Sequence, residues 1–263
     1  MTAPLLNVRT SGIISTMSLI KTASFHVAIY SKGNPNSSKF ALIIPGKLDT
    51  KNYANMVSHV NYMANKGYFA LSFDPPGTWE SQGDIKIYTM TNYLKAINEI
   101  ISHYGNKPTV IIGHSRGGRM AELAGAINPH VEGFVSIMGT LRQENINIKK
   151  DEWEEKYAVS LRDLPPGGGE KIKKHVLPYS FYEDEINYQL TDEIKHSKKP
   201  KLFFLGKRDT ILNPQIIRDA YKLFSQPKEL YELDSGHDYR LDLKIVDEVN
   251  NVIGNFLERY NLL

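Results

Sequence analysis

The sequence predicts an α/β fold with a mostly parallel central sheet and helices on both of its faces. Short apolar runs rich in Val, Ile and Phe alternate with longer segments whose apolar residues recur every three or four positions. Several apolar runs have no polar alternation, which is typical of strands that are covered on both faces. Two helical segments are followed by Gly67 and Gly105, where a left-handed C-terminal cap prefers glycine.

The apolar runs predict strands at residues 24–30, 40–44, 68–73, 109–112, 131–138, 201–205 and 229–233. The helical patterns lie at residues 53–65, 90–104, 118–127, 214–224 and 243–260. The first two strands flank a turn-rich stretch, residues 33–38, and this arrangement predicts a β-hairpin with a long loop.

Residues 141–196 interrupt the alternation and are interpreted as an inserted, mainly helical lid. The segment is dense in charged and aromatic residues and contains Pro165 and Pro166 followed by three glycines. Long irregular insertions in compact domains often serve a function. The expected organisation is a core of residues 1–140 and 197–263 with a lid of residues 141–196. The alternative is a surface excursion that contacts no functional site.

Composition and charge exclude several classes of protein. The chain has 263 residues, of which 41% are hydrophobic and 23% charged, as in ordinary globular proteins. The 32 Lys and Arg exceed the 29 Asp and Glu only slightly, which argues against a nucleic-acid partner. The chain has no cysteine, so disulfides, thiolate nucleophiles and cysteine-ligated zinc are excluded.

The chain carries no sign of a membrane span or a signal peptide. No window approaches eighteen consecutive apolar residues, the length that a membrane helix needs. Residues 1–20 have no basic start, and Arg9 stands where a signal peptide has its apolar centre. We therefore expect a cytoplasmic protein without a membrane span. The sequence gives no signal for the oligomeric state.

The most informative segment is TVIIGHSRGG, residues 109–118, in which Gly113 to Gly117 has the form G-x-S-x-G. The motif lies between an apolar strand and a helical pattern, which is the setting that a nucleophile elbow requires. A serine on so sharp a turn has strained backbone angles, and side chains at the two glycines would collide with neighbouring backbone.

With this motif in its setting, the chain resembles the serine-nucleophile branch of the α/β-hydrolase superfamily, with an inserted lid as in its esterases and lipases. The resemblance covers nearly the whole chain, and it places the lid after the sixth strand of that fold, residues 131–138 here. Members carry nucleophile, acid and base in that chain order. The matching residues are Ser115, Asp209 and His237. Asp234, close to the histidine in sequence, is the alternative acid.

These three residue types suit nucleophilic catalysis. A serine hydroxyl is a poor nucleophile at neutral pH, so a neutral imidazole must take its proton, the role expected of His237. A carboxylate on the other ring nitrogen, expected to be Asp209, fixes the tautomer. The resemblance also implies an oxyanion hole made by two backbone amides. They are those of Arg116 and of Lys47, with Leu48 as the alternative to Lys47, in a loop where Pro45-Gly46 replaces the more usual His-Gly.

Four side chains are candidates for substrate contacts: Leu48, Trp79, His114 and Trp153. Trp79 belongs to residues 74–81, DPPGTWES, which resemble a loop that borders the active site in the family. It forms a pocket wall or packs against the sheet edge, and His114 could simply pack. The cationic side chains of Lys47 and Arg116 either attract an anionic substrate or pair with carboxylates.

The expected activity is hydrolysis of a carboxylic ester of a small or medium-sized substrate through an acyl-enzyme on Ser115. Thioesterase, amidase or peptidase, lipase and carbon-carbon bond hydrolase activities share the same triad, and a non-catalytic small-molecule receptor is the alternative from another class. No phosphate loop, dinucleotide fingerprint or zinc motif is found, so no cofactor and no metal are expected.

Overall fold

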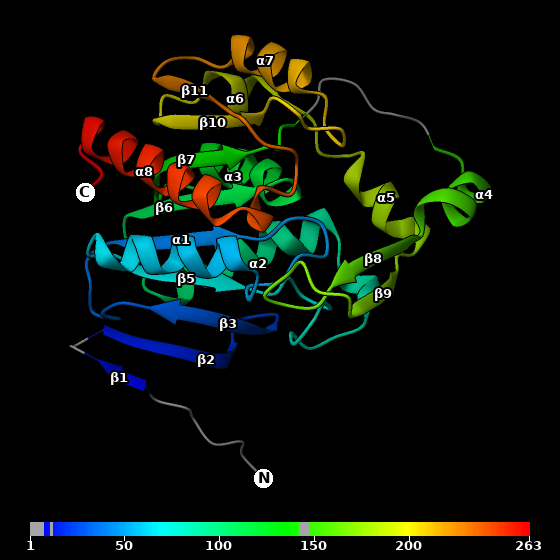
Figure 1. Ribbon diagram of the computed structural model, residues 1–263, viewed down its shortest axis with the longest axis horizontal. Coiled ribbons are helices and arrows are strands. Elements are labelled where there is room, and N and C mark those ends of the chain that lie inside the picture. Colours follow the sequence, from blue (N-terminus) through cyan, green and yellow to red (C-terminus); the bar gives the residue numbers. More distant parts are fainter. Residues whose placement is uncertain (1–7, 11–12, 142–147) are drawn as a thin grey trace.

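The computed structural model describes residues 8–10, 13–141 and 148–263, and Figure 1 shows a twisted central sheet between layers of helices. The sheet strands in this part of the chain are β1 (Val8–Thr10), β2 (Ile13–Lys21), β3 (His26–Lys32), β4 (Phe40–Ile44), β5 (Phe69–Phe73), β6 (Thr109–His114), β7 (Val131–Ile137), β10 (Lys201–Gly206) and β11 (Lys228–Leu233). They lie in the order β1-β2-β3-β5-β4-β6-β7-β10-β11. In this order, each strand from β5 to β11 is parallel to its neighbours in that range. The pairs β1-β2, β2-β3 and β3-β5 are antiparallel. The predicted α/β fold with a mostly parallel sheet is confirmed.

Helices cover both faces of this sheet (Figure 1). The core helices are α1 (Ala54–Asn65), α2 (Met90–His103), α3 (Arg116–Ile127), α7 (Pro214–Leu223) and α8 (Leu243–Arg259), and each lies within two residues of its predicted range. One apolar cluster joins α1 and α8 to one face of the sheet, and another joins α2, α3 and α7 to the opposite face. None of the described helices is long and apolar enough to cross a membrane.

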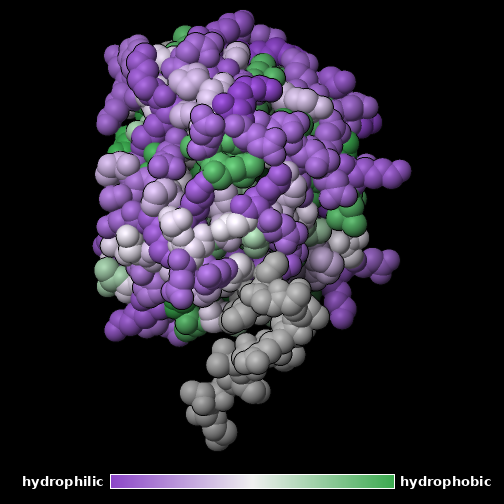
Figure 2. Space-filling model, turned by 90° about the vertical axis from the view of Figure 1, so that its left-hand side faces the viewer, coloured by the Kyte–Doolittle hydropathy of each residue, from purple (hydrophilic) through white to green (hydrophobic). Residues whose placement is uncertain are grey.

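The central strands are apolar because both of their faces are buried. All residues of β4, β5 and β6 are buried, which explains why these segments lack polar alternation. Figure 2 shows the face of the molecule on the left of Figure 1, where hydrophilic side chains dominate and apolar ones form only small, separate groups. Apolar residues therefore gather inside the sheet and helix layers, as the alternating pattern requires.

The predicted hairpin between residues 24–30 and 40–44 is wrong. Strand β3 pairs with β2 and β5, whereas β4 pairs in parallel with β5 on one side and β6 on the other. A hairpin with β3 would displace one of the two parallel neighbours of β4. The N-terminal strand β2, to which no strand is assigned in the sequence analysis, supplies the outer partner of β3 instead.

Between β7 and β10 the chain leaves the core of sheet and flanking helices. The described elements there are α4 (Lys150–Glu152), a π-helical turn η2 (Trp153–Tyr157), β8 (Val159–Asp163), β9 (Ile172–Val176), α5 (Tyr179–Glu185) and α6 (Asp192–His196). Residues 142–147 of the expected insertion lie outside the described residues. The expectation of a mainly helical segment is wrong for β8 and β9, which flank the turn at Pro165-Pro166 and form an antiparallel sheet of their own.

A buried ion pair joins the loops that follow β4 and β5. One carboxylate oxygen of Asp74 accepts hydrogen bonds from the Thr50 hydroxyl (2.8 Å) and the Lys51 amide (2.9 Å). The other accepts from Lys51 Nζ at 2.9 Å and from the Glu80 amide at 3.2 Å. Asp74 and Lys51 are 0% and 1% exposed, so each depends on the other to offset the loss of hydration.

We predict that Asp74→Ala lowers the free energy of unfolding by about 3–5 kcal/mol, because it removes the buried partner of the Lys51 ammonium. Glu80→Gln is the matched control, since the Glu80 side chain contacts the same ammonium but is 64% exposed, and it should change stability by less than about 1 kcal/mol. Urea unfolding followed by circular dichroism measures both variants. Equal small effects would contradict the role given to Asp74.

Candidate active site

Ser115 occupies the sharp turn between β6 and α3. Its backbone angles are φ 54° and ψ −118°, in a region that residues other than glycine rarely adopt. The turn closes because two neighbours have no side chain. A Cβ atom on Gly113 would lie 2.0 Å from the Gly117 carbonyl oxygen, and one on Gly117 would lie 2.2 Å from the Ile44 carbonyl oxygen. The turn therefore holds the Ser115 side chain away from the sheet.

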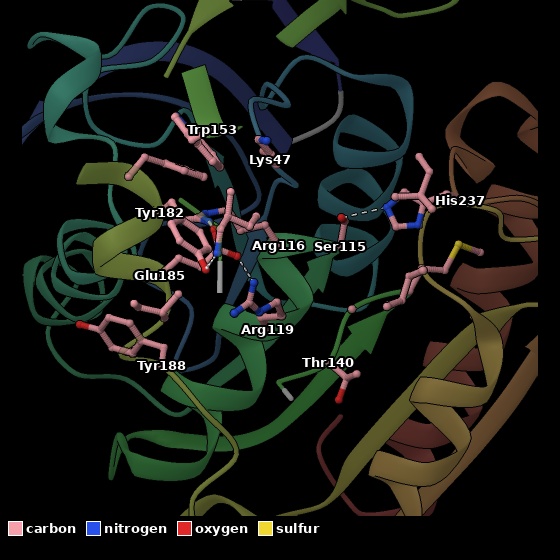
Figure 3. Close-up of a pocket in the computed structure, with 17 residues that line it drawn as sticks. Lys47, Ser115, Arg116, Arg119, Thr140, Trp153, Tyr182, Glu185, Tyr188 and His237 are labelled. Atoms are coloured by element: carbon pink, nitrogen blue, oxygen red, sulfur yellow. Dashed lines mark hydrogen bonds and ion pairs between the residues drawn. The ribbon is translucent and has the colours of Figure 1, made fainter. Parts of the chain in front are cut away.

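The structure brings Ser115, His237 and Asp209 together in one chain of hydrogen bonds. Ser115 Oγ lies 2.9 Å from His237 Nε2, the contact drawn in Figure 3, and His237 Nδ1 lies 2.7 Å from Asp209 Oδ2. The three residues follow the carboxyl ends of β6, β11 and β10, which meet at one edge of the sheet. An ionised Asp209 only accepts, so Nδ1 carries the proton and Nε2 accepts from the serine hydroxyl.

Asp209 is held in its ionised form. Burial alone would raise its pKa, but the hydrogen bond from His237 and those from the amides of Leu212 and Ile211 lower the pKa below its ordinary value. The two amides donate to Asp209 Oδ1 at 2.9 and 2.8 Å. The alternative acid, Asp234, is 70% exposed and pairs with Arg208 at 3.3 Å, away from the histidine.

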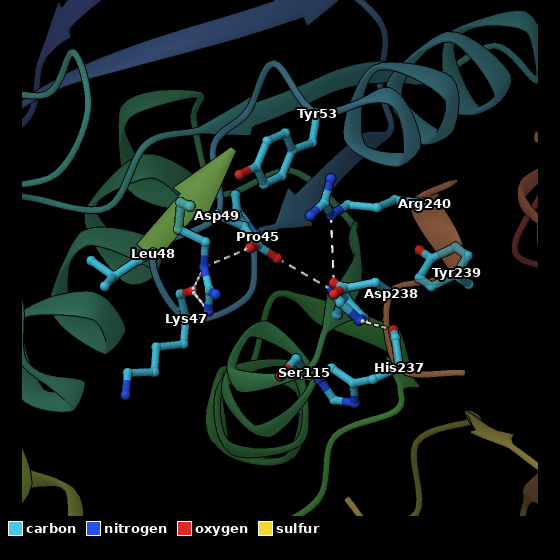
Figure 4. A network of polar contacts seen from close by, with 12 residues as sticks. Pro45, Lys47, Leu48, Asp49, Tyr53, Ser115, His237, Asp238, Tyr239 and Arg240 are labelled. Atoms are coloured by element: carbon cyan, nitrogen blue, oxygen red, sulfur yellow. Dashed lines mark hydrogen bonds and ion pairs between the residues drawn. The ribbon is translucent and has the colours of Figure 1, made fainter. Parts of the chain in front are cut away.

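Two backbone amides beside Ser115 are available to a ligand. Within the described part of the chain, the N–H groups of Arg116 and Lys47 donate to no acceptor. The N–H of Leu48, the alternative donor, is occupied because it donates to the Tyr88 hydroxyl at 3.1 Å. Figure 4 shows the loop from Pro45 to Asp49 beside Ser115 and His237. In the described chain, the amides of Arg116 and Lys47 are thus two donors without an acceptor, the number that an oxyanion hole uses.

An arginine of β8 holds the loop that carries Lys47. Arg162 Nε and Nη2 donate to the Lys47 carbonyl oxygen at 3.0 and 2.7 Å, and Nε also lies 3.5 Å from the Asp49 carboxylate. The neighbouring Asp163 forms a bidentate ion pair with Arg240, in which Nη1 and Nη2 each donate to one carboxylate oxygen at 2.9 Å. The β8 strand is therefore fastened to the loops on which Lys47 and His237 lie.

A cavity of about 300 Å³ opens beside Ser115 and His237. Its core wall includes Met138, Ile211 and Leu212, and its outer wall is made by Ile148, Trp153, Phe181, Tyr182, Ile186 and Tyr188. The outer residues all belong to the segment between β7 and β10, so that segment forms one wall of the cavity beside Ser115. Figure 3 shows Trp153, Tyr182 and Tyr188 on the side of the cavity opposite His237.

Four charged side chains also line this cavity: Lys47, Arg116, Arg119 and Glu185. Glu185 bridges the two arginines. Arg116 Nη1 lies 2.5 Å from one of its carboxylate oxygens, and Arg119 Nη1 forms an ion pair with the other. Burial by itself would raise the pKa of Glu185, but the two guanidinium groups lower it to about 2. The carboxylate is therefore ionised at neutral pH.

The Lys47 ammonium lies over aromatic rings rather than beside a carboxylate. Its Nζ is 5.4 Å from the Phe181 ring centroid and 5.7 Å from that of Trp153. Burial lowers the pKa of Lys47 to about 8; the carboxylate of Glu185 opposes this shift, and the guanidinium groups of Arg116 and Arg162 add to it.

Of the four side chains expected to contact substrate, Trp153 lines the cavity, and Leu48, Trp79 and His114 do not. Trp79 donates from Nε1 to the Leu48 carbonyl at 2.8 Å and packs edge-on against His175 of β9. His114 lies behind the site, where Nε2 donates to the His237 carbonyl at 3.0 Å. These residues support the loops around the cavity from outside.

Sequence reasoning missed Arg119, Glu185 and Arg162. Arg116 and Arg119 are three residues apart at the start of one helix, so they share a face and indicate a common carboxylate partner. Glu185 and Arg162 come from the segment between β7 and β10, and nothing in their local sequence points to Ser115. Only the tertiary structure brings them to the cavity.

Comparisons with known proteins agree with this architecture. A family model described as alpha/beta hydrolase fold matches residues 42–161. No curated protein matches the sequence. Among solved structures, the chain is similar to alpha/beta hydrolase domain-containing protein 10 from mouse, at 18% identity over 92% of this chain and 98% of that one, with a TM-score of 0.71.

Two further solved structures are similar in fold. The ferulic acid complex of Est1E from Butyrivibrio proteoclasticus shares 17% identity over 92% of this chain and 99% of that one, with a TM-score of 0.71. The thioesterase domain from the curacin biosynthetic pathway shares 13% identity over 92% and 99% of the two chains, with a TM-score of 0.69. At these identities the likeness concerns the fold.

Glu122 of α3 holds the chain just after β7, and its ionisation should make the stability of the protein depend on pH. It is fully buried, its carboxylate accepts from the Leu141 amide at 2.8 Å, and burial raises its pKa to about 8 despite that hydrogen bond. The folded chain therefore keeps a proton that the unfolded chain releases near pH 4.5. The free energy of unfolding contributed by Glu122 should fall as pH rises from about 4.5 towards 8.

Glu122→Gln keeps a hydrogen-bond acceptor and removes the titration. The stability of this variant relative to the native chain should therefore rise steadily between pH 5 and pH 8, as measured by urea unfolding at a series of pH values. A difference that stays constant across this range would show that Glu122 is not protonated in the folded chain.

Proposed function

Because this chain belongs to the α/β-hydrolase superfamily, we propose that it is a serine hydrolase that cleaves a carboxylic ester of a small or medium-sized substrate. The observation that carries the proposal is the continuous path of hydrogen bonds from Ser115 through His237 to Asp209, with contacts of 2.9 and 2.7 Å. A serine linked in this way to a neutral imidazole and a carboxylate is the arrangement that activates a hydroxyl for attack on an acyl carbon.

The first half of the reaction forms an acyl-enzyme. Ser115 Oγ attacks the ester carbonyl carbon while its proton passes to His237 Nε2, and Asp209 stabilises the imidazolium that forms. The negative charge that develops on the carbonyl oxygen is bound by the N–H groups of Lys47 and Arg116. Collapse of this intermediate breaks the bond to the alcohol oxygen, which takes the proton back from His237.

The second half regenerates the enzyme. A water molecule gives a proton to His237 Nε2 and attacks the acyl carbon, and the same two amides bind the new oxyanion. Collapse breaks the bond to Ser115 Oγ, which regains its proton from His237, and the carboxylic acid leaves. The whole cycle consumes one water and releases one acid and one alcohol.

We further propose that residues 141–196 act as a lid over this site. The proposal is supported by the outer wall of the cavity, which consists of side chains from this segment, and by the bonds of Arg162 to the Lys47 carbonyl. A cavity of about 300 Å³ lies at the small end of ligand pockets and suits a substrate of modest size.

A hydrolysis panel tests the proposed activity. We expect p-nitrophenyl esters from acetate to palmitate to be hydrolysed faster than a matched amide, with a preference for short acyl chains because of the cavity volume. Ser115→Ala should lower kcat/KM by about 10⁴-fold or more while the circular dichroism spectrum stays unchanged. Ester turnover that survives in Ser115→Ala, or a folded native chain that turns over no ester, would refute the proposal. A thioester in the same panel separates a thioesterase from an esterase.

Arg162 is a positioning residue in this scheme, because it acts through the peptide of Lys47. Arg162→Met should lower kcat by roughly ten- to a hundredfold, with little change in KM, since the oxyanion donor loses its orientation when the two bonds to its carbonyl are removed. Arg162→Lys, which keeps one donor, should recover part of the rate. Arg208→Met, at an arginine that is 68% exposed, is the control. A kcat within twofold of the native value in Arg162→Met would contradict this role.

A further inference from the structure

The cavity beside Ser115 carries an excess of positive charge. Among its described lining residues, Lys47, Arg116 and Arg119 are cationic, and Glu185 is the one carboxylate. Glu185 forms ion pairs with both arginines, and each of its carboxylate oxygens contacts one guanidinium group. The short contacts of Glu185 are therefore with the two arginines, and its carboxylate acts on the Lys47 ammonium only from beyond 4.0 Å.

Lys47 is the cation that lacks a partner. Among the residues that the structure describes, its Nζ has no carboxylate within 4.0 Å and no hydrogen-bond acceptor. It makes cation–π contacts with the rings of Phe181 and Trp153 instead. The Lys47 side chain is only partly exposed, and ring faces replace the lost hydration of an ammonium only in part. An anion in the cavity would complete this site with a charge-assisted hydrogen bond.

The position of Lys47 indicates which part of a substrate the anion belongs to. In Figures 3 and 4, His237 lies on one side of Ser115 and Lys47 on the other. His237 protonates the departing alcohol, so the alcohol part must lie on the side of His237. The acyl part then extends towards Lys47. Because the Lys47 amide is a proposed donor to the carbonyl oxygen, the ammonium lies one lysine side chain away from the reacting carbonyl.

Resting on the proposed hydrolase function, we propose that the acyl part of the substrate ends in a carboxylate that the Lys47 ammonium binds. The substrate class is a half-ester of a short dicarboxylic acid. One free ammonium matches the single charge of a carboxylate, and the arginine pair beside it adds a favourable field. Hydrolysis adds one water across the ester bond and releases the dicarboxylic acid and the alcohol, with no other reactant.

A pair of covalent probes tests this specificity without depending on turnover. Ethyl p-nitrophenyl pentylphosphonate is compared with its analogue in which a carboxylate replaces the terminal methyl group. In each case Ser115 Oγ bonds to phosphorus, its proton passes to His237, and p-nitrophenolate leaves. The second-order rate constant is read from nitrophenolate release, and mass spectrometry of the Ser115 peptide locates the adduct. We expect the carboxylate probe to react at least roughly tenfold faster in the native chain.

Lys47→Met should abolish this preference, and Lys47→Arg, which keeps the charge, should retain most of it. The rate with the methyl probe in each variant reports separately on the backbone donor of Lys47. Lys173→Met is the matched control, because the Lys173 ammonium also lies over an indole, 4.6 Å from the Trp79 ring centroid, but does not line the cavity. It should leave the preference unchanged.

The outcomes separate this inference from the function on which it rests. Equal rates for the two probes in the native chain, or a preference that survives Lys47→Met, would overturn the carboxylate site and leave the hydrolase proposal intact. Failure of both probes to modify Ser115 in folded protein would overturn both proposals.

Discussion

The strained turn at Ser115 is the constraint on which the rest of the site depends. A residue with a side chain at φ 54° and ψ −118° has a high local energy, and close backbone packing maintains it. That packing requires glycine at positions 113 and 117, where any Cβ would collide with a carbonyl oxygen. The same turn begins α3, and it thereby leaves the Arg116 amide without a helical acceptor beside the hydroxyl.

The remaining parts of the site are loops that the parallel sheet brings to one edge. The loop after β4 carries Lys47 and is held from two directions, by the buried Asp74 pair on the side of the core and by Arg162 on the side of β8. The segment between β7 and β10 thus contacts the loop that carries Lys47 and also forms one wall of the cavity. Changes in this segment should therefore alter both the shape of the cavity and the geometry of that loop.

The sequence predicts the core well because local pattern and burial agree there. Strands such as β4 and β6 are short apolar runs buried on both faces, and the candidate residues Ser115, Asp209 and His237 each follow the end of such a run. The pairing of β3 was predicted wrongly because neighbours in sequence need not be neighbours in a sheet. Glu185 and Arg162 could not be predicted, since their contacts span 69 and 115 residues of the chain.

Activation of Ser115 by His237 can be measured by covalent labelling with a fluorophosphonate probe. We expect rapid modification of the native chain, located on Ser115 by peptide mass spectrometry, and a loss of labelling by several orders of magnitude in folded His237→Ala. Absence of labelling in the folded native chain, or equal labelling of the two proteins, would show that His237 does not activate Ser115 and would favour a binding protein that has kept this fold.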